Sequence, residues 1–501
     1  MSYRQHLAYI AALNDQFRYY KTVESLFELD QWSALPPEGG AYRQQVAAHI
    51  AQQKAALFAA EDARKAAEYF AGVEQSGIED EVERGLIRTF LFRYRNATRT
   101  PADLTRKYSL LKADTMNAWK LAREKQDFQI FLPWLEQAFS LKKQIALSID
   151  PEAPAFDTLV GLNDEGACCA EISREFDVLS AGLSDLLGRI QASPVQPDLS
   201  LLSLEEDPAH MEAFSQRLAR ESGYKDSRGG FNNRVVHGFS SFMGPRDGRV
   251  STPRNGSFNL IFTYLHEAGH AMYSSGGSDR VNAANMWGGI EGGFQEAMAR
   301  FNENMVGRSR AYWEYYYPQL QQEFPAFKGV SLDQFYQTMN AVRPSMKRIA
   351  ADEVTYSLHV ILRYELERDY FSGKLAARDI EDRWNELCGK YLGIRPANAT
   401  EGVLQDMHWA GDYIGYFQSY ALGNLYGGQI YEAVRRDLPD LDAQLRMGRF
   451  DKLNDWLDAN VRQYGCCYTA GQLAEKISGK RLDAQPFLKY LEDKYSALYR
   501  L

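Results

Sequence analysis

Cysteine is scarce in this chain of 501 residues, which has only five. The count is odd, and four of the five form two adjacent pairs; the positions are Cys168, Cys169, Cys388, Cys466 and Cys467. Such a set is a poor framework for disulfides, and the C-x-x-C spacing of many zinc sites is absent from the sequence. The cysteines therefore indicate buried thiols in a reducing cytoplasm, and they argue against a small secreted fold held by disulfides.

Long apolar runs and an excess of basic residues are also missing. No stretch approaches the roughly 18 consecutive apolar residues of a membrane span, and no basic start leads into an apolar run. We therefore expect neither a membrane anchor nor a secretory signal. Lys and Arg number 57 against 66 Asp and Glu, so the net charge is −9, which does not favour a nucleic-acid partner.

Helical periodicity is the dominant pattern of apolar residues in the sequence. Apolar residues recur at three- and four-residue spacing, most clearly over 42–60, 103–125, 170–190 and 208–220. Asp103 and Asp207 stand where helix N-caps are expected. Over 223–253, glycine and asparagine instead punctuate short β-branched and aromatic runs, which favours a small hairpin or sheet. The predicted fold is mainly α, a large helical body with a small β-sheet near its middle.

A candidate metal site lies in 264–272, where His266, Glu267 and His270 form the pattern H-E-x-x-H. Residues four apart on a helix lie on one face, so both imidazoles can reach one zinc ion. The glutamate between them projects towards the open position, where it can take a proton from water. Two of only eight histidines fall in this segment, which favours a metal site over a solvated helix face.

A catalytic zinc of this type needs a third protein ligand. Three acids follow the motif: Glu291, Glu296 and Glu303. Glu291 lies among glycines, which is typical of a loop, whereas Glu296 and Arg300 share one face of a predicted helix. The residues alone leave the choice open, because each acid is equally compatible with a surface position.

Six segments, taken in order, resemble motifs of the Taq carboxypeptidase family, the thermostable zinc metallocarboxypeptidases that remove C-terminal amino acids. They include L-Q-D-x-H-W and G-Y-F-P-T-Y, and they occupy 29–37, 118–128, 304–309, 351–356, 404–409 and 415–420. The resemblance covers essentially the whole chain. It implies a helical body with a deep central groove and a small sheet near the metal. It also implies a homodimer that acts on peptides with a free C-terminus.

The resemblance also predicts how the chain is organised into domains. It implies a single metallocarboxypeptidase-like domain over 1–501, with a helical N-terminal part of about 1–220 and a catalytic part of about 221–501. By the same resemblance, 295–304 occupies the family's second metal motif, H-E-S-x-S-R-x-x-E-N. Glu296 therefore carries over as the third zinc ligand and Glu267 as the general base, with Zn²⁺ the expected metal and Co²⁺ or another divalent ion the alternative.

Several positions depart from the family pattern. Gln295 stands where the family has histidine, and Ala297 where it has serine. Gln418 and Ser419 replace the proline and threonine of G-Y-F-P-T-Y. Because the ligands are kept while their surroundings change, this pattern implies altered substrate preference or weakened catalysis.

Recognition of a free C-terminal carboxylate favours arginine, whose planar fork pairs with both carboxylate oxygens. Arg249 and Arg348 lie in the family's two arginine motifs and are our candidates for this role. The alternative for each is a structural ion pair, for example Arg348 with Asp352. Asp352 is also a candidate to orient a ligating histidine.

The oxyanion that develops during peptide hydrolysis needs a hydrogen-bond donor as well as the metal. Tyr416, Tyr420 and His237 are candidates, and Gln295 would be a neutral amide donor to the substrate. Each tyrosine is equally compatible with a place in the core. His408, beside a tryptophan, is expected to be structural.

Three functions remain open from the sequence. The first is a zinc metallocarboxypeptidase, and the second is a related helical zinc peptidase that acts as an oligopeptidase. The third is a catalytically impaired paralogue that binds peptides without hydrolysing them. Retention of Glu267 argues against the third, because a protein that only binds has no need of that base.

Overall fold

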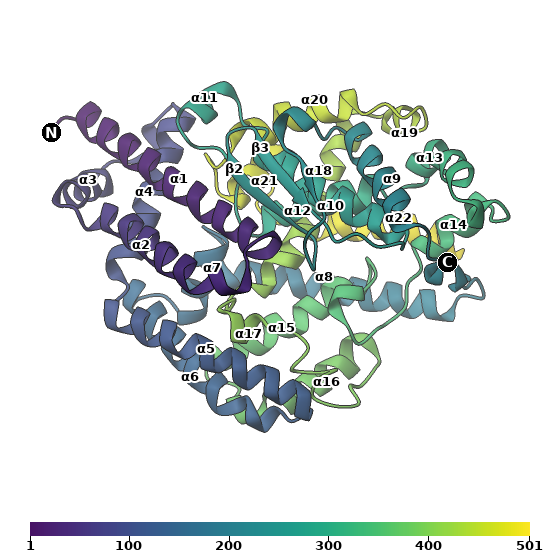
Figure 1. The fold of residues 1–501 in the computed structure, drawn as a ribbon, viewed down its shortest axis with the longest axis horizontal. Helices are drawn as coiled ribbons and strands as arrows, with labels where there is room; N and C mark the ends of the chain where they lie inside the picture. The colour runs from purple at the N-terminus through teal and green to yellow at the C-terminus, as the bar shows by residue number, and fades with distance from the viewer.

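The computed structural model describes residues 1–501, apart from the side chain at position 37. Helices account for most of the chain, and Figure 1 shows them arranged around one small sheet. The helices before the sheet are α1 (Tyr3–Ser33), α2 (Gly40–Ala59), α3 (Glu61–Ala71), α4 (Glu81–Arg99), α5 (Ala102–Lys125), α6 (Leu132–Ile149), α7 (Ala155–Asn163), α8 (Cys169–Ala192) and α9 (Pro208–Glu221).

After the sheet, helices continue almost to the end of the chain. They are α10 (Asn259–Ser274), α11 (Asp279–Ala283), α12 (Gly293–Arg300), α13 (Arg310–Glu323), α14 (Leu332–Met339), α15 (Tyr356–Phe371), α16 (Ile380–Leu392), α17 (His408–Gly411), α18 (Phe417–Asp437), α19 (Leu441–Leu445), α20 (Asp451–Asn460), α21 (Ala470–Ser478) and α22 (Gln485–Tyr499). A π-helical turn, Phe301–Val306, continues directly from α12.

The helices predicted from periodicity are confirmed as α2, α5, α8 and α9. Asp207 caps α9, because its carboxylate accepts a hydrogen bond from the main-chain nitrogen of His210 at 2.8 Å. The predicted cap at Asp103 is wrong: α5 begins at Ala102 after Pro101. Asp103 lies in the first turn instead, where its negative charge still faces the positive end of the helix dipole.

The predicted sheet is confirmed within 223–253. It consists of β1 (Phe231–Asn232), β2 (Phe239–Gly244) and β3 (Asp247–Ser251), in the order β1-β3-β2. β2 and β3 form an antiparallel hairpin, and β1 pairs with β3 in parallel. Both strands of the hairpin pack against α10, so the sheet lies against the helix that carries the H-E-x-x-H motif.

A large apolar cluster fills the body of the molecule. Its buried members run from Tyr108 to Tyr499 and come from helices on both sides of the sheet in sequence. A smaller cluster, which includes Ile10, Phe70 and Ile87, joins α1, α3 and α4 at the N-terminal end. No helix in the described part of the chain combines the length and the apolar character that a membrane crossing requires.

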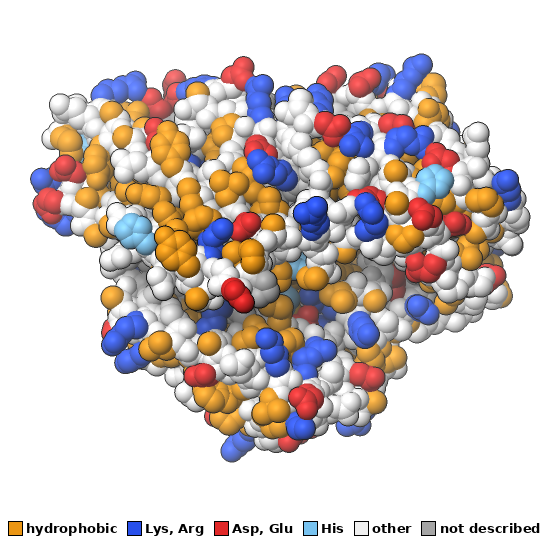
Figure 2. Space-filling model, viewed as in Figure 1, with side chains coloured by type: hydrophobic (Ala, Val, Ile, Leu, Met, Phe, Trp, Pro, Cys, Tyr) orange, Lys and Arg blue, Asp and Glu red, His pale blue; other side chains and the backbone are white. Residues whose placement is uncertain are grey.

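The surface is hollowed across the middle of the molecule. Figure 2 shows this hollow between the upper part, which carries α1, β2 and β3, and the lower part, which carries α5, α15 and α17. The helix α10 lies behind the sheet at this level (Figure 1). The mainly helical fold with a small sheet next to the motif helix is therefore as predicted.

Candidate metal centre

The motif helix α10 is buried on most of its surface. Its buried apolar residues include Leu260, Ile261, Tyr264, Leu265, Ala268 and Ala271. His266 and His270 emerge one turn apart on the remaining face, with ring centroids 4.9 Å apart. The four-residue spacing thus places both imidazoles side by side, as expected for a helix.

Glycine at two positions lets the helices of the site approach closely. A Cβ atom on Gly269 of α10 would lie 2.7 Å from the Cα atom of Ala299 on α12. On the other side, a Cβ atom on Gly423 of α18 would lie 2.5 Å from the Cβ atom of Glu296. The helix α12 is therefore held between two helices at backbone distance, which brings Glu296 to the histidine pair.

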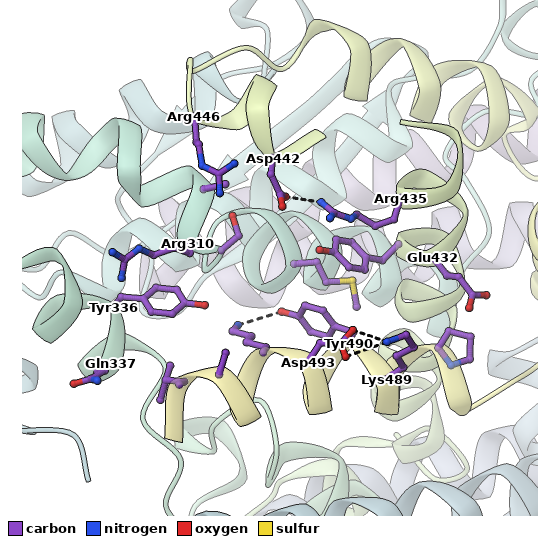
Figure 3. Close-up of a pocket in the computed structure, with 18 of the residues that line it drawn as sticks. Arg310, Tyr336, Gln337, Glu432, Arg435, Asp442, Arg446, Lys489, Tyr490 and Asp493 are labelled. Carbon is purple, nitrogen blue, oxygen red and sulfur yellow. Dashed lines mark hydrogen bonds and ion pairs between the residues drawn. The ribbon is translucent and has the colours of Figure 1, made fainter. Parts of the chain in front are cut away.

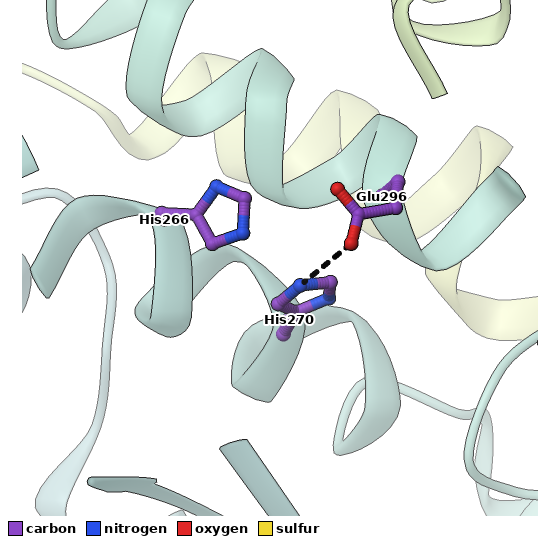
Figure 4. A group of neighbouring side chains, drawn as sticks. All are labelled: His266, His270 and Glu296. Carbon is purple, nitrogen blue, oxygen red and sulfur yellow. Dashed lines mark ion pairs between the residues drawn. The ribbon is translucent and has the colours of Figure 1, made fainter. Parts of the chain in front are cut away.

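His266, His270 and Glu296 each offer one ligand atom, and these atoms all lie within 4.8 Å of one another. Figure 4 shows the two rings and the carboxylate directed towards a common centre. The Nε2 atom of His270 is 3.9 Å from Oε1 of Glu296. Two imidazole nitrogens and one carboxylate oxygen form the donor set of many catalytic zinc sites.

Hydrogen bonds fix which nitrogen of each ring is free. Nδ1 of His266 lies 3.0 Å from Oε2 of Glu303, and Nδ1 of His270 lies 3.2 Å from Oε1 of Gln295. Both partners are acceptors, so each ring carries its proton on Nδ1 and keeps a lone pair on Nε2. The residues present therefore fit a divalent cation, since both free nitrogens face the Glu296 carboxylate.

Charge around Glu296 keeps it ionised. Burial acts to raise its pKa, but Arg300 and the two histidines outweigh burial and lower the pKa overall. Nε of Arg300 lies 3.3 Å from Oε2 of Glu296, one turn along the same helix. One oxygen is thus engaged by arginine, and the other remains directed at His270.

The π-helical turn after α12 places Glu303. Burial acts to raise the pKa of Glu303, but hydrogen bonding to His266 and the charge of Arg308 lower it to about 2. The carboxylate is therefore charged at neutral pH and stabilises the Nδ1–H form of His266. The sequence alone indicates Glu303 only as a possible ligand or a surface acid.

The base candidate Glu267 points to the sheet side of the helix and is only 7% exposed. The hydroxyl of Ser240 on β2 lies 2.8 Å from its Oε2 atom and 2.8 Å from its main-chain oxygen. The neighbouring Gly238 also lies against this carboxylate. The sheet therefore positions Glu267, a contact that nothing in the sequence signalled.

Arg348 lies in a wall of largely buried side chains that also contains Asp406, Arg363 and Tyr356. Its Nε and Nη2 atoms donate to Oδ1 of Asp406 at 3.1 and 3.0 Å, and Nη1 donates to Tyr356 at 3.0 Å. Arg363 donates to the other oxygen of Asp406 at 2.7 Å. Burial acts to raise the pKa of Asp406, but the two arginines hold it well below its usual range.

The tyrosines of the G-Y-F-P-T-Y segment lie beside this wall. The guanidinium of Arg348 is 4.7 Å from the ring centre of Tyr420, whose hydroxyl lies 3.0 Å from Nε2 of His408. The ring of Tyr416 packs edge-on against Tyr420. Burial raises the pKa of both tyrosines, so both hydroxyls stay protonated at neutral pH. His408 is thus a direct partner of Tyr420, in addition to its buried packing.

His237 and Arg249 lie on the sheet side of the hollow. His237 is exposed and contacts the ring of Trp32 edge-on, with centroids 5.2 Å apart. Arg249 on β3 forms a two-point ion pair with Asp247, both hydrogen bonds being 2.9 Å long. The contacts described for these two candidates involve none of the residues of the wall formed by Arg348 and the tyrosines.

The expected contact of Asp352 with a ligating histidine is wrong. Asp352 accepts hydrogen bonds from the main chain of Arg343, Val354 and Thr355, so it organises a loop. Arg348 does form a buried ion pair, which is the alternative role expected for it, but its partner is Asp406 and not Asp352.

A buried acid, Asp164, joins the helices that carry the site. It accepts from the main-chain nitrogen of Gly293 at 2.6 Å, from Ser419 at 2.6 Å and from Gln418 at 3.0 Å. The starts of α12 and α18 are therefore tied together through one carboxylate. Gln418 and Ser419, which depart from the family pattern, both take part in this contact.

A family model described as carboxypeptidase Taq (M32) metallopeptidase matches residues 10–495 of the chain. The chain belongs to this family. It is 33% identical to thermostable carboxypeptidase 1 of Thermus thermophilus, over 100% of this chain and 98% of that protein. It is also 33% identical to thermostable carboxypeptidase 1 of Pyrococcus furiosus, over 83% of this chain and 84% of that protein.

Solved structures agree with this membership. The fold matches an M32 carboxypeptidase from Deinococcus radiodurans with a TM-score of 0.92 at 31% identity, covering 100% of this chain and 99% of the other. It matches a Pyrococcus furiosus carboxypeptidase with a TM-score of 0.93 at 30% identity, covering 99% of both chains. The predicted family, fold and activity class of this M32 metallocarboxypeptidase are thereby confirmed.

Proposed function

We propose that this M32 metallocarboxypeptidase uses a divalent ion held by His266, His270 and Glu296 to release the last residue of peptides. Zn²⁺ is the first choice for this donor set, and Co²⁺ is the alternative. The proposal is supported by the two Nδ1 contacts, which leave both Nε2 lone pairs facing one carboxylate.

When bound, the ion would polarise the scissile carbonyl and acidify a water molecule. Glu267 accepts the proton from the attacking water, since it lies between the two histidines on one helix. The same carboxylate then gives the proton to the leaving amine and returns to its ionised form. One water is thus added across the bond, which releases an amino acid and a shortened peptide.

The wall that contains Arg348 and the two tyrosines is proposed to hold the substrate. Tyr416 and Tyr420 keep their protons, so they are able to donate to the developing oxyanion. Arg348 has five N–H donors and retains capacity for a substrate carboxylate beside Asp406. Arg249 is the second candidate for the carboxylate, and His237 would contact the substrate from the sheet side.

For Gln295, the hydrogen bonds support a role different from the substrate contact expected from the sequence. Its oxygen accepts from His270, and its nitrogen donates to Ser274 at 2.7 Å and to Gly288 at 2.9 Å. We infer that Gln295 orients His270 from behind and leaves the oxyanion to the tyrosines.

We further propose that the enzyme acts in the cytoplasm as a homodimer of single-domain subunits on peptides with a free C-terminus. In the described part of the chain all five cysteines are free, in keeping with a reducing compartment. The main apolar cluster includes residues from both the N-terminal and the catalytic part, in keeping with one domain.

Hydrolysis of N-blocked dipeptides and longer peptides tests the proposal. The enzyme is stripped with a chelator and then reloaded with zinc or cobalt, with Glu267→Gln as the control. We expect release of single C-terminal residues by the loaded enzyme and none by the variant. Metal binding without turnover would contradict the proposal, and equal cleavage of C-terminally amidated peptides would indicate an oligopeptidase.

A further inference from the structure

A second cavity of about 740 Å³ lies between α13, α14, α18, α19 and α22 (Figure 3). It is distinct from a cavity of about 540 Å³ that is lined by Arg300 and Glu303, which contact Glu296 and His266 of the candidate metal site. Met305 of the π-helical turn lines the second cavity, whereas Glu303 lines the first. The volume of the second cavity is typical of sites for small molecules.

Apolar and aromatic side chains form part of the wall of this cavity. Tyr336, Tyr431, Tyr490 and Met305 line it, together with Leu498 of the C-terminal helix. Figure 3 shows the ring of Tyr336 directed into the open space. Such a wall provides van der Waals contact for an apolar or aromatic side chain.

Guanidinium groups line one side of this second cavity. Arg435 pairs with Asp442 at 2.5 Å, and Arg310 and Arg446 share one carboxylate, that of Glu314. Each arginine has five N–H donors, so one or two carboxylate partners do not exhaust it. Figure 3 shows Arg446, Asp442 and Arg435 together on this side of the cavity. This side therefore retains donors for a ligand carboxylate.

The C-terminal helix α22 supplies an acid on the opposite side. Asp493 lines the cavity and pairs with Lys489 one turn away, at 2.8 Å. Both side chains of this pair are mostly exposed, with relative exposures of 64% and 71%, so the pair is weak. An ammonium group of a ligand can therefore replace Lys489 beside Asp493 at little cost.

We propose that this cavity is a second ligand site that binds a zwitterionic amino acid with an apolar side chain. The ligand carboxylate lies against Arg435, its ammonium group against Asp493, and its side chain against Tyr336 and Met305. Cavity charges of both signs match a molecule that carries both. The choice of an amino acid, which is a product of the reaction, rests on the proposed function.

Two contacts between lining residues connect the second cavity to the cavity that contains Glu303. Lys494 lines the second cavity and forms a buried ion pair at 2.7 Å with Glu353, which lines the first cavity. The hydroxyl of Tyr490 donates to the main-chain oxygen of Asn304, next to Glu303. An occupant of the second cavity would therefore contact Lys494 and Tyr490, whose partners Glu353 and Asn304 line the cavity that also contains Glu303.

Calorimetric titration of L-phenylalanine into the metal-loaded Glu267→Gln enzyme tests the site. A tryptophan at Ala497, which lines the cavity, should weaken binding by at least about tenfold. The matched control is Ala153→Trp, which lines a different cavity of about 440 Å³ and should leave binding unchanged. Unchanged binding in Ala497→Trp would place the ligand in the catalytic groove and overturn the proposal.

Two blocked analogues and two mild variants keep the test decisive if Ala497→Trp misfolds. N-acetylphenylalanine lacks the ammonium group and phenylalaninamide lacks the carboxylate, so each should bind at least about tenfold more weakly. Arg435→Gln should weaken phenylalanine but not the amide, and Asp493→Asn should weaken phenylalanine but not the N-acetyl form. Equal binding of blocked and free forms, or no saturable binding, would overturn the proposal.

Peptide hydrolysis by the unsubstituted enzyme is measured separately, so failure of the second ligand site is distinguishable from failure of the proposed function.

Discussion

The Nδ1 atom of His270 lies 3.2 Å from the amide oxygen of Gln295. The amide nitrogen is committed to Ser274 and Gly288, so the oxygen must face the imidazole. The family motif has a histidine at this position, and here an amide fixes the tautomer of His270, a proposed metal ligand. The departure at position 295 preserves the Nε2 lone pair that the site requires.

Gln295→Ala should lower zinc affinity by about 10- to 100-fold, because loss of the acceptor frees His270 to rotate and to change tautomer. Competition with a chelator of known affinity measures the effect. Gln295→His restores a ring that is able to accept from His270, so it should recover most of the affinity. Equal affinity in all three proteins would show that the contact does not orient the ligand.

Ser240→Ala should lower kcat by about tenfold with little change in KM, since a hydrogen bond to a charged group contributes about 1.5–3 kcal/mol. The physical reason is that Ser240 holds the carboxylate of Glu267 at 2.8 Å. Steady-state hydrolysis of a blocked dipeptide provides the measurement. Ser241→Ala, the next residue on β2, is the control and should leave kcat unchanged.

Gly269→Ala should destabilise the folded protein by about 1–3 kcal/mol, the usual cost of overpacking, and should weaken zinc binding. The added methyl group would lie 2.7 Å from the backbone of α12. Gly188→Ala in α8 is the matched control, because its methyl group would meet nothing within 4 Å. That variant should be about 1 kcal/mol more stable, as expected for alanine in an exposed helix. The free energy of unfolding of both variants is measured with a denaturant. A Gly269→Ala variant as stable as Gly188→Ala would contradict close packing at Gly269.

The stability of the protein should fall in mild acid partly because of His359. Burial, with the charges of Arg363 and Arg348, lowers the pKa of His359 from 6.5 to about 3. Between these pH values the unfolded chain binds a proton that the folded chain does not. The contribution of His359 to stability is therefore complete above pH 6.5 and is lost progressively as the pH falls towards 3.

His359→Gln removes this titration. The slope of unfolding free energy against pH should become shallower by up to about 1.4 kcal/mol per pH unit within that window. Urea unfolding at several pH values measures the slope. His49→Gln, at an exposed position of α2, should leave the slope as it is in the unsubstituted protein. An unchanged slope in His359→Gln would show that His359 titrates normally.

Local features of the metal centre could be predicted from the sequence. The pairing of His266 with His270 depends only on the pitch of one helix, and the hairpin after Phe231 on turn residues. The choice of Glu296 as third ligand could not be made from helical periodicity, which does not distinguish it from Glu291 and Glu303. Only the family resemblance favours Glu296. Asp103 shows the usual limit at helix ends, where a shift of one residue turns a cap into a first-turn acid.

Contacts between distant segments could not be predicted. Ser240 and Glu267 are 27 residues apart in the chain, and His266 and Glu303 are 37 apart. Their meeting depends on how the sheet and the π-helical turn pack against α10, for which a single sequence carries no local signal. The mistaken role for Asp352 has the same cause, since the acid that orients His266 is chosen by tertiary packing.

The close packing of α12 against Gly269 of α10 and Gly423 of α18 has a consequence for metal exchange. A helix confined at backbone distance on two sides has no room to slide or to rotate when an ion enters or leaves. We therefore expect the backbone of α12 to stay in place when the metal is loaded or released, with the Glu296 side chain making the adjustment. A metal site whose backbone is held in this way should need little reorganisation energy to bind its ion.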